Sequence, residues 1–129
     1  MVGLDTGFFI GLMRGDAKAC DFWASLPEGD RLPVVSLLSL GELLYVSYRI
    51  GAPETGRELV DSIDRSARVM PVDRRVVEKA ASLKAGRGIP YVDAMILATF
   101  LISGCSEIHT TDRGHFADVP NKGLTFHFY

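Results

Sequence analysis

Apolar and polar positions alternate along the chain in short blocks that predict strands and helices in turn. Residues 1–5 (MVGLD) form a short apolar run that ends in an acid, which predicts a buried strand. Residues 6–15 and 16–26 predict two helices separated at Gly15, and Asp16 is well placed to cap the second one. The apolar positions of this second helix recur at helical spacing and predict one buried face: Ala19, Phe22, Trp23 and Leu26.

The same alternation continues to the end of the sequence. Strands are expected at residues 31–36, 68–73, 107–112 and 124–129, and helices at residues 38–51, 52–67, 74–88 and 93–104. Strands that alternate with helices are typical of an α/β sandwich around a mostly parallel sheet. We therefore expect a single α/β domain over residues 1–129, with ligands bound at the carboxyl ends of its strands.

Composition is that of an ordinary soluble domain. The 129 residues are 47% hydrophobic and 23% charged, and no apolar run reaches the roughly 18 residues of a membrane span. The N-terminus lacks the features of a signal peptide, so we expect a cytoplasmic protein. A net charge of −2 argues against holding nucleic acid by bulk electrostatics, but it is compatible with a local basic rim. Cys20 and Cys105 stand far apart and are expected to be reduced and buried, with neither a zinc site nor a disulfide framework.

Four acids stand at or near the ends of the predicted elements. Asp5 ends the first strand, Asp112 follows the fourth, Glu42 lies one turn into the helix after the second, and Asp93 opens an almost entirely apolar helix. Each has a structural interpretation by itself: Asp5 and Asp93 as helix caps, Asp112 as a turn residue, and Glu42 on a narrow polar stripe. For Asp93 alone, capping is the favoured interpretation.

Taken together, the four acids favour a different interpretation. A parallel sheet could bring them to one edge, where two carboxylates about 4 Å apart would repel by about 4 kcal/mol at an effective dielectric of about 20. Such a group must be protonated or neutralised by a cation, and hard oxygen ligands favour Mg²⁺ or Mn²⁺. These ions can activate water and stabilise charge on a phosphodiester. The hypothesis is that Asp93 faces a metal pocket.

Four segments carry a family resemblance: LDTGFFI, SLLSLGEL, VDAMILATFLISG and HTTDRGHF. Together they resemble the motifs of PIN-domain ribonucleases, above all the small VapC-type toxins of toxin–antitoxin pairs. No single motif is specific, but all four occur in the right order over nearly the whole chain. The resemblance implies a PIN-like three-layer sandwich with a sheet of about five strands. It also implies an endoribonuclease that depends on Mg²⁺ or Mn²⁺, an RNA substrate, a cognate antitoxin and a homodimer.

The resemblance also assigns residues. It gives metal binding and catalysis to Asp5, Glu42, Asp93 and Asp112, with Asp5 and Asp93 as the firmest matches, and it matches three hydroxyl positions beside the site: Thr6, Ser39 and Thr110. Many relatives carry a further acid where this chain has His115. That side chain either contacts a phosphate or packs against Phe116, and we favour the second interpretation.

Substrate-binding residues are not identified by the sequence. Four cations could rim the pocket, although a solvated surface position is the favoured interpretation for each: Arg14, Lys18, Arg49 and Arg113. Four aromatic residues could stack on bases, although aromatic residues within helices more often belong to the core: Phe8, Phe9, Tyr45 and Tyr48.

Two alternatives and one regulatory expectation remain. The chain could be a catalytically silent PIN-like module that binds RNA or protein. A receiver-type phosphoacceptor is disfavoured, because Asp5 has no acidic neighbour and Lys122 precedes the last strand. If the chain is a toxin, we expect an antitoxin with an apolar C-terminal segment that packs near Phe8, Phe9 and Tyr45. Its Arg or Lys should extend toward the acids and compete with metal: Asp5, Glu42 and Asp93.

Overall fold

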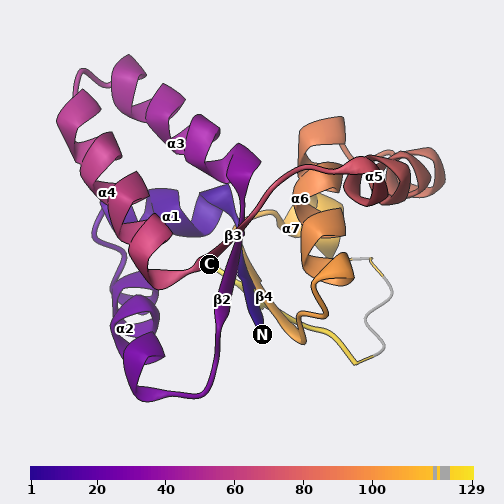
Figure 1. The fold of residues 1–129 in the computed structure, drawn as a ribbon, viewed down its shortest axis with the longest axis horizontal. Coiled ribbons are helices and arrows are strands. Elements are labelled where there is room, and N and C mark those ends of the chain that lie inside the picture. The colour runs from indigo at the N-terminus through magenta and orange to yellow at the C-terminus, as the bar shows by residue number, and fades with distance from the viewer. Residues whose placement is uncertain (118, 120–122) are drawn as a thin grey trace.

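The computed structural model describes residues 1–117, 119 and 123–129, and its centre is a five-stranded sheet (Figure 1). The strand order is β3-β2-β1-β4-β5, and every pairing between these strands is parallel. The strands are β1 (Val2–Leu4), β2 (Pro33–Ser36), β3 (Arg68–Met70), β4 (Glu107–Thr110) and β5 (Thr125–Phe128). The predicted five-stranded parallel sheet is therefore confirmed. Lys122, which entered the argument against a receiver-type protein, lies outside the described residues.

Helices cover both faces of the sheet (Figure 1). One face carries α1 (Thr6–Met13), α2 (Ala17–Ser25), α3 (Leu37–Arg49) and α4 (Pro53–Ser66), with a short 3-10 turn, η1 (Leu26–Glu28), after α2. The other face carries α5 (Arg74–Arg87), α6 (Tyr91–Ile102) and α7 (Arg113–Phe116). The layers are those of the predicted three-layer α/β sandwich.

Side-chain alternation along the strands explains the two cores. Val2 and Leu4 of β1 belong to a core cluster with α1, whereas Gly3 between them faces α6. A Cβ atom at Gly3 would lie 2.6 Å from the Phe100 ring, so a larger residue would clash with it. This glycine therefore lets the C-terminal part of α6, which carries Phe100, approach the sheet closely.

Helix α6 begins two residues earlier than the sequence predicts, and this corrects one interpretation of Asp93. The N-cap position is Pro90, which offers no side-chain hydrogen bond, and Asp93 lies within the first turn. The suggestion that Asp93 caps its helix is therefore wrong. By contrast, Asp16 does cap α2, because its Oδ1 accepts a hydrogen bond from the Ala19 amide at 2.9 Å.

Two other expectations from composition can be compared with the structure. Cys20 and Cys105 are both free, but only Cys105 is buried and Cys20 is half-buried. Within the described residues, no single helix is long and apolar enough to cross a membrane, although α5 and α6 together, bent by 120°, have the length and composition to do so.

Candidate functional site

The four acids identified in the sequence line one cavity of about 370 Å³. They come from four separate places in the fold: Asp5 follows β1, Glu42 lies in α3, Asp93 in α6, and Asp112 just beyond β4. The rest of the wall consists of Thr6, Gly7, Ile10, Ile96, Thr111 and Phe116. The parallel sheet thus brings the carboxylates together at the carboxyl ends of β1 and β4, while their chemical role remains a prediction.

Two of the acids are held in place by capping a helix. Oδ1 of Asp5 accepts a hydrogen bond from the Phe8 amide at 2.9 Å and caps α1. Oδ1 of Asp112 accepts one from the His115 amide at 3.1 Å and caps α7. The capping interpretation is thus correct for Asp5, whereas Asp112, which was interpreted as a turn residue, caps a short helix. Neither cap excludes a role in the cavity, because each carboxylate has a second oxygen.

A hydroxyl network orients Glu42. The Thr6 hydroxyl lies 2.6 Å from Oε1 of Glu42 and 2.9 Å from Oγ of Ser39. A hydroxyl has a single hydrogen, so Thr6 donates it to the Glu42 oxygen at the shorter distance, and Ser39 then donates to Thr6. Ser39 is fully buried and is not among the described residues that line the cavity, so its contact with the site runs through Thr6.

Thr110 connects two of the acids. Its Oγ1 accepts a hydrogen bond from the Asp112 amide at 2.9 Å, and its hydroxyl hydrogen-bonds the Asp5 carboxyl. Thr110 is fully buried at the end of β4. The sequence placed this hydroxyl beside the site, and in the structure it holds the loop after β4 against the end of β1.

The electrostatics of the cavity disfavour four ionised acids. Asp5 is only 7% exposed, and its burial raises the pKa to about 6. Hydrogen bonds from Thr110 and Phe8 lower this pKa, but by less than burial raises it. The charges of Asp112 and Asp93 raise the pKa of Asp5 further. Burial also raises the pKa of Asp93, to which the charges of Asp112 and Glu42 add. A cation in the cavity would relieve this repulsion, and the oxygen donors fit Mg²⁺ or Mn²⁺.

His115 lies beside the acids. Its Nδ1 lies 2.8 Å from Oδ2 of Asp112 and 3.9 Å from Oδ2 of Asp93, and its side chain is 42% exposed. One ligand atom from each of these three residues lies within 4.8 Å of the others, close enough to share a metal ion. The favoured interpretation, in which His115 packs against Phe116, does not describe this arrangement. The first turn of α7 instead places the ring over Asp112, three residues before it.

The sequence reasoning missed Gly7, which determines how closely α1 approaches the cavity. A Cβ atom there would lie 2.1 Å from Oγ1 of Thr111 and 3.4 Å from Oδ1 of Asp5. A larger side chain would push α1 away from the loop after β4. The available signal was a glycine inside the first turn of a helix, where its backbone entropy is unfavourable and a close approach is a common reason for it.

The cations and aromatic residues proposed as substrate contacts lie elsewhere. Three cations sit over aromatic rings: Lys18 over Tyr129, Arg49 over Tyr45, and Arg113 over Phe128. None of these, nor Arg14, is among the described residues that line the cavity. Base stacking on Phe8 or Phe9 is wrong because both are fully buried, whereas Tyr45 and Tyr48 are 59% and 53% exposed.

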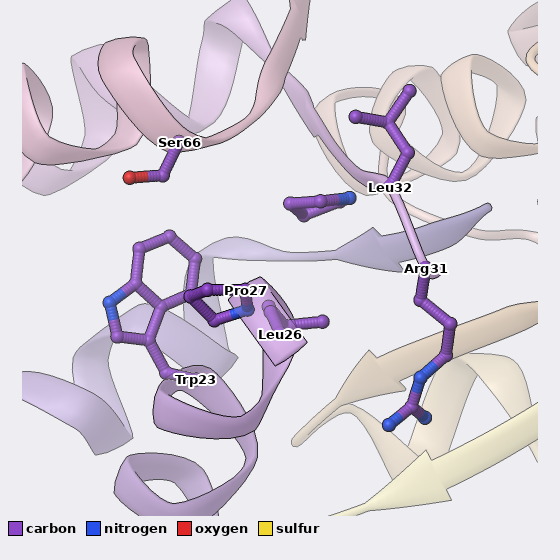
Figure 2. Close-up of a pocket in the computed structure, with 7 residues that line it drawn as sticks. Trp23, Leu26, Pro27, Arg31, Leu32 and Ser66 are labelled. Carbon is purple, nitrogen blue, oxygen red and sulfur yellow. The ribbon is translucent and has the colours of Figure 1, made fainter. Parts of the chain in front are cut away.

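A second cavity of about 370 Å³ has different chemistry (Figure 2). Its walls are mainly apolar: Trp23, Leu26, Pro27, Leu32 and Pro33, with Arg31 and Ser66. Figure 2 shows Trp23 and Arg31 well apart, with Pro27 and Leu26 between them in this view. The described residues that line this second cavity include no carboxylate. Of these two cavities, only the acidic one offers carboxylate donors for a divalent cation.

Solved structures confirm the fold. VapBC2 from Rickettsia felis, solved bound to a promoter DNA fragment, matches with a TM-score of 0.80 at 15% identity, covering 100% of this chain and 99% of that one. A toxin–antitoxin complex from Klebsiella pneumoniae matches with a TM-score of 0.76 at 20% identity, covering 96% and 95%. VapC20 from Mycobacterium tuberculosis, a toxin that cleaves the sarcin-ricin loop, matches with a TM-score of 0.74 at 22% identity, covering 95% and 98%. At these identities the likeness shows the fold.

Sequence comparison identifies the family. No curated protein matches the chain. The family model described as PIN domain matches residues 2–122, which include the four acids of the cavity. This match over nearly the whole sequence agrees with the parallel sheet and with the VapC-like structural neighbours. The chain therefore belongs to the PIN-domain family.

Proposed function

We propose that this protein is a metal-dependent endoribonuclease that hydrolyses RNA phosphodiester bonds and acts as the toxin of a toxin–antitoxin pair. The observation that carries the proposal is the convergence of Asp5, Glu42, Asp93 and Asp112 in one cavity. Membership of the PIN-domain family and the VapC fold of the structural neighbours support it.

The proposed cofactor is Mg²⁺ or Mn²⁺, with Asp5 and Asp93 as principal ligands and Glu42 and Asp112 as further ligands. When bound, such an ion supplies an activated water and stabilises charge on the phosphodiester. The chain itself orients the ligands: Thr6 directs Glu42, and Thr110 joins Asp5 to the loop that carries Asp112.

His115 is proposed to contact the substrate. Its Nδ1 faces Asp112, so its Nε2 is the ring nitrogen left to face a phosphate oxygen at the exposed rim, to which it donates when the ring is in the imidazolium form. This corresponds to the first of the two interpretations drawn from the sequence, in which His115 contacts a phosphate. Exchange of His115 for Gln should therefore weaken RNA binding more than it weakens metal binding.

The proposed protein partners are an antitoxin and a second copy of this chain. Several structural neighbours are described as toxin–antitoxin complexes, some of them with DNA bound. We propose that the antitoxin directs an Arg or Lys toward Asp5, Glu42 and Asp93, where it competes with metal. The sequence-based expectation that the antitoxin packs near Phe8 and Phe9 is wrong, because both side chains are buried. Tyr45 on α3, which was expected beside them, is exposed.

RNA cleavage by purified protein tests the proposal and separates it from a silent binding module. Wild type should cleave RNA with Mg²⁺ or Mn²⁺ and lose this activity in EDTA. Asp93→Asn should cleave at least about 10²–10³-fold more slowly, which is the effect of removing a group that stabilises charge in the transition state. Asp16→Asn is the control, because Asp16 caps α2 and does not line the cavity. Metal-independent cleavage, or wild-type cleavage by a folded Asp93→Asn variant, would contradict the proposal.

A further inference from the structure

A second group of polar side chains lies on the other side of β4 from Thr110. Glu107 and His109 are two residues apart on β4, so both point to the face of the sheet that packs against α1 and α2. His127 on β5 is the register partner of His109, and their rings stack with centroids 4.4 Å apart. Two imidazoles and one carboxylate therefore share one face across two strands.

The distances within this group are those of ligands around a metal. Oε2 of Glu107 lies 3.4 Å from Nε2 of His109 and 3.4 Å from Nε2 of His127, and all three atoms lie within 4.8 Å of one another. Charge-assisted hydrogen bonds are shorter, about 2.7–2.9 Å. Two ligand atoms at about 2.0–2.1 Å from a tetrahedral ion lie about 3.4 Å apart. The distance from the Glu107 oxygen to each imidazole nitrogen is therefore the distance expected between two ligands of one metal ion.

The surroundings of His109 prepare its Nε2 for binding. Its Nδ1 lies 2.5 Å from the Tyr129 hydroxyl, so a proton on Nδ1 can be held there while Nε2 faces Glu107. The ring also stacks on Phe22 at 3.9 Å.

We propose that Glu107, His109 and His127 bind a transition-metal ion, Zn²⁺ in the first instance, with water in the remaining position. Imidazole ligands suit Zn²⁺, whereas the all-carboxylate donors of the acidic cavity suit Mg²⁺ or Mn²⁺. The ion would join the edge strand β5 to β4. This site uses no cysteine, and it departs from the expectation, drawn around Cys20 and Cys105, that the chain has no zinc site.

Arg31 is the group that opposes metal binding. Its guanidinium lies 3.4 Å from the same Oε2 of Glu107 and 4.9 Å from the centre of the Phe22 ring. The Arg31 side chain is 43% exposed, so it can move into solvent when the ion binds. Exchange of Arg31 for Gln removes this competing charge and should tighten Zn²⁺ binding.

Calorimetric titration of Zn²⁺ in saturating Mg²⁺ tests the proposal. Wild type should bind one equivalent at this group. Loss of a residue that hydrogen-bonds a metal ligand typically weakens metal binding 10–100-fold, and loss of a ligand should cost more. His127→Gln should therefore weaken Zn²⁺ binding by more than about 100-fold, and Tyr129→Phe by about 10-fold. His127 is 45% exposed, so its exchange should leave the fold intact, which circular dichroism checks.

The matched control is His115→Gln, because Asp93, Asp112 and His115 also offer three clustered ligand atoms. This variant should keep the Zn²⁺ equivalent that His127→Gln loses. Equal Zn²⁺ affinity in wild type and His127→Gln would overturn the proposal. So would loss of the equivalent in His115→Gln, because that result would place the ion in the acidic cavity.

Discussion

Strand β4 contributes to two groups of polar side chains that differ in charge balance. Beyond its carboxyl end, Asp112 joins Asp5, Glu42 and Asp93 in a cavity where burial and neighbouring acids raise the pKa values of Asp5 and Asp93. On its α1–α2 face, the single carboxylate of Glu107 is surrounded by three nitrogen-bearing side chains. The first group needs a cation to relieve repulsion, whereas the second is already neutralised. The two proposed metal sites therefore differ in their place on this strand, because one lies beyond its carboxyl end and the other on its face toward α1 and α2.

The largest effect expected from this difference is a pH dependence of stability caused by Asp5. Its pKa is raised from 3.8 to about 6, so its contribution to stability is fully present below pH 3.8 and is lost as the pH rises through 6. The loss is roughly 3 kcal/mol, at 1.36 kcal/mol for each pH unit. Asp5→Asn keeps a good N-cap and should be more stable than wild type by up to that amount at pH 7, but not at pH 3.5. Urea unfolding in EDTA at several pH values measures this.

A control of opposite sign is available at Asp73, an exposed N-cap. The hydrogen bond from the Val76 amide is the main cause that lowers the pKa of Asp73, so its contribution is present above the unfolded pKa and is lost as the pH falls. Asp73→Asn should therefore show its difference from wild type at neutral pH and lose it in acid. A constant difference between wild type and Asp5→Asn over the whole range would contradict the account of the cavity.

The second effect is stabilisation by Mg²⁺. At a concentration 100 times its dissociation constant, a ligand selective for the native state contributes about 2.7 kcal/mol. Thermal unfolding should therefore move to a higher Tm in wild type, and the rise should be much smaller in Asp93→Asn. His127→Gln should show the full rise, because His127 belongs to the other group. An equal rise in Asp93→Asn would show that Mg²⁺ acts outside the acidic cavity.

The third effect concerns the close approach at Gly7. Gly7→Ala places a methyl group 2.1 Å from Oγ1 of Thr111, so it should destabilise the protein by about 1–3 kcal/mol, as overpacking does. The double variant with Thr111→Ala removes that oxygen and should recover part of the loss. Denaturant unfolding of the four proteins gives the coupling energy. Additive effects of the two changes would contradict the contact.

The smallest effect is expected from the bond between Thr6 and Glu42. Thr6→Val removes a hydroxyl that lies 2.6 Å from the carboxylate, which should cost about 1–2 kcal/mol at most, because Glu42 is half-buried and partly solvated. The variant should fold and keep RNA cleavage at a reduced rate. Single-turnover cleavage measures this, and an unchanged rate would show that Thr6 does not orient Glu42 for the reaction.

Much of the fold could be predicted from local patterns. Alternating apolar blocks located the strands, and the ends of the predicted elements identified Asp5 and Asp112 as site candidates. Both inferences depend only on neighbouring residues in the sequence. Helix α6 was placed two residues late, since Pro90 can occupy the N-cap position without a capping side chain. The burial of Phe8 and Phe9 was not settled because α1 is apolar on all sides, and periodicity then gives no direction.

What could not be predicted depends on contacts between distant segments. Gly7 meets Thr111 only because β1 and β4 are neighbours in the sheet. His109 and His127 share a face only because β4 and β5 pair in one particular register. The sequence predicted a sheet but not its strand order, so neither contact could be derived from it. The pairing of His115 with Asp112 likewise required the geometry of the short helix α7.

The central claim is that four carboxylates from separate segments form one divalent-cation site. The most direct test is anomalous X-ray diffraction from crystals of the protein soaked in Mn²⁺, with the wavelength chosen for manganese. The account predicts an anomalous peak in the cavity between Asp5 and Asp93, and its loss in crystals of Asp5→Asn. The account would be contradicted if saturating Mn²⁺ gave no anomalous peak in this cavity, or if the peak persisted in crystals of Asp5→Asn.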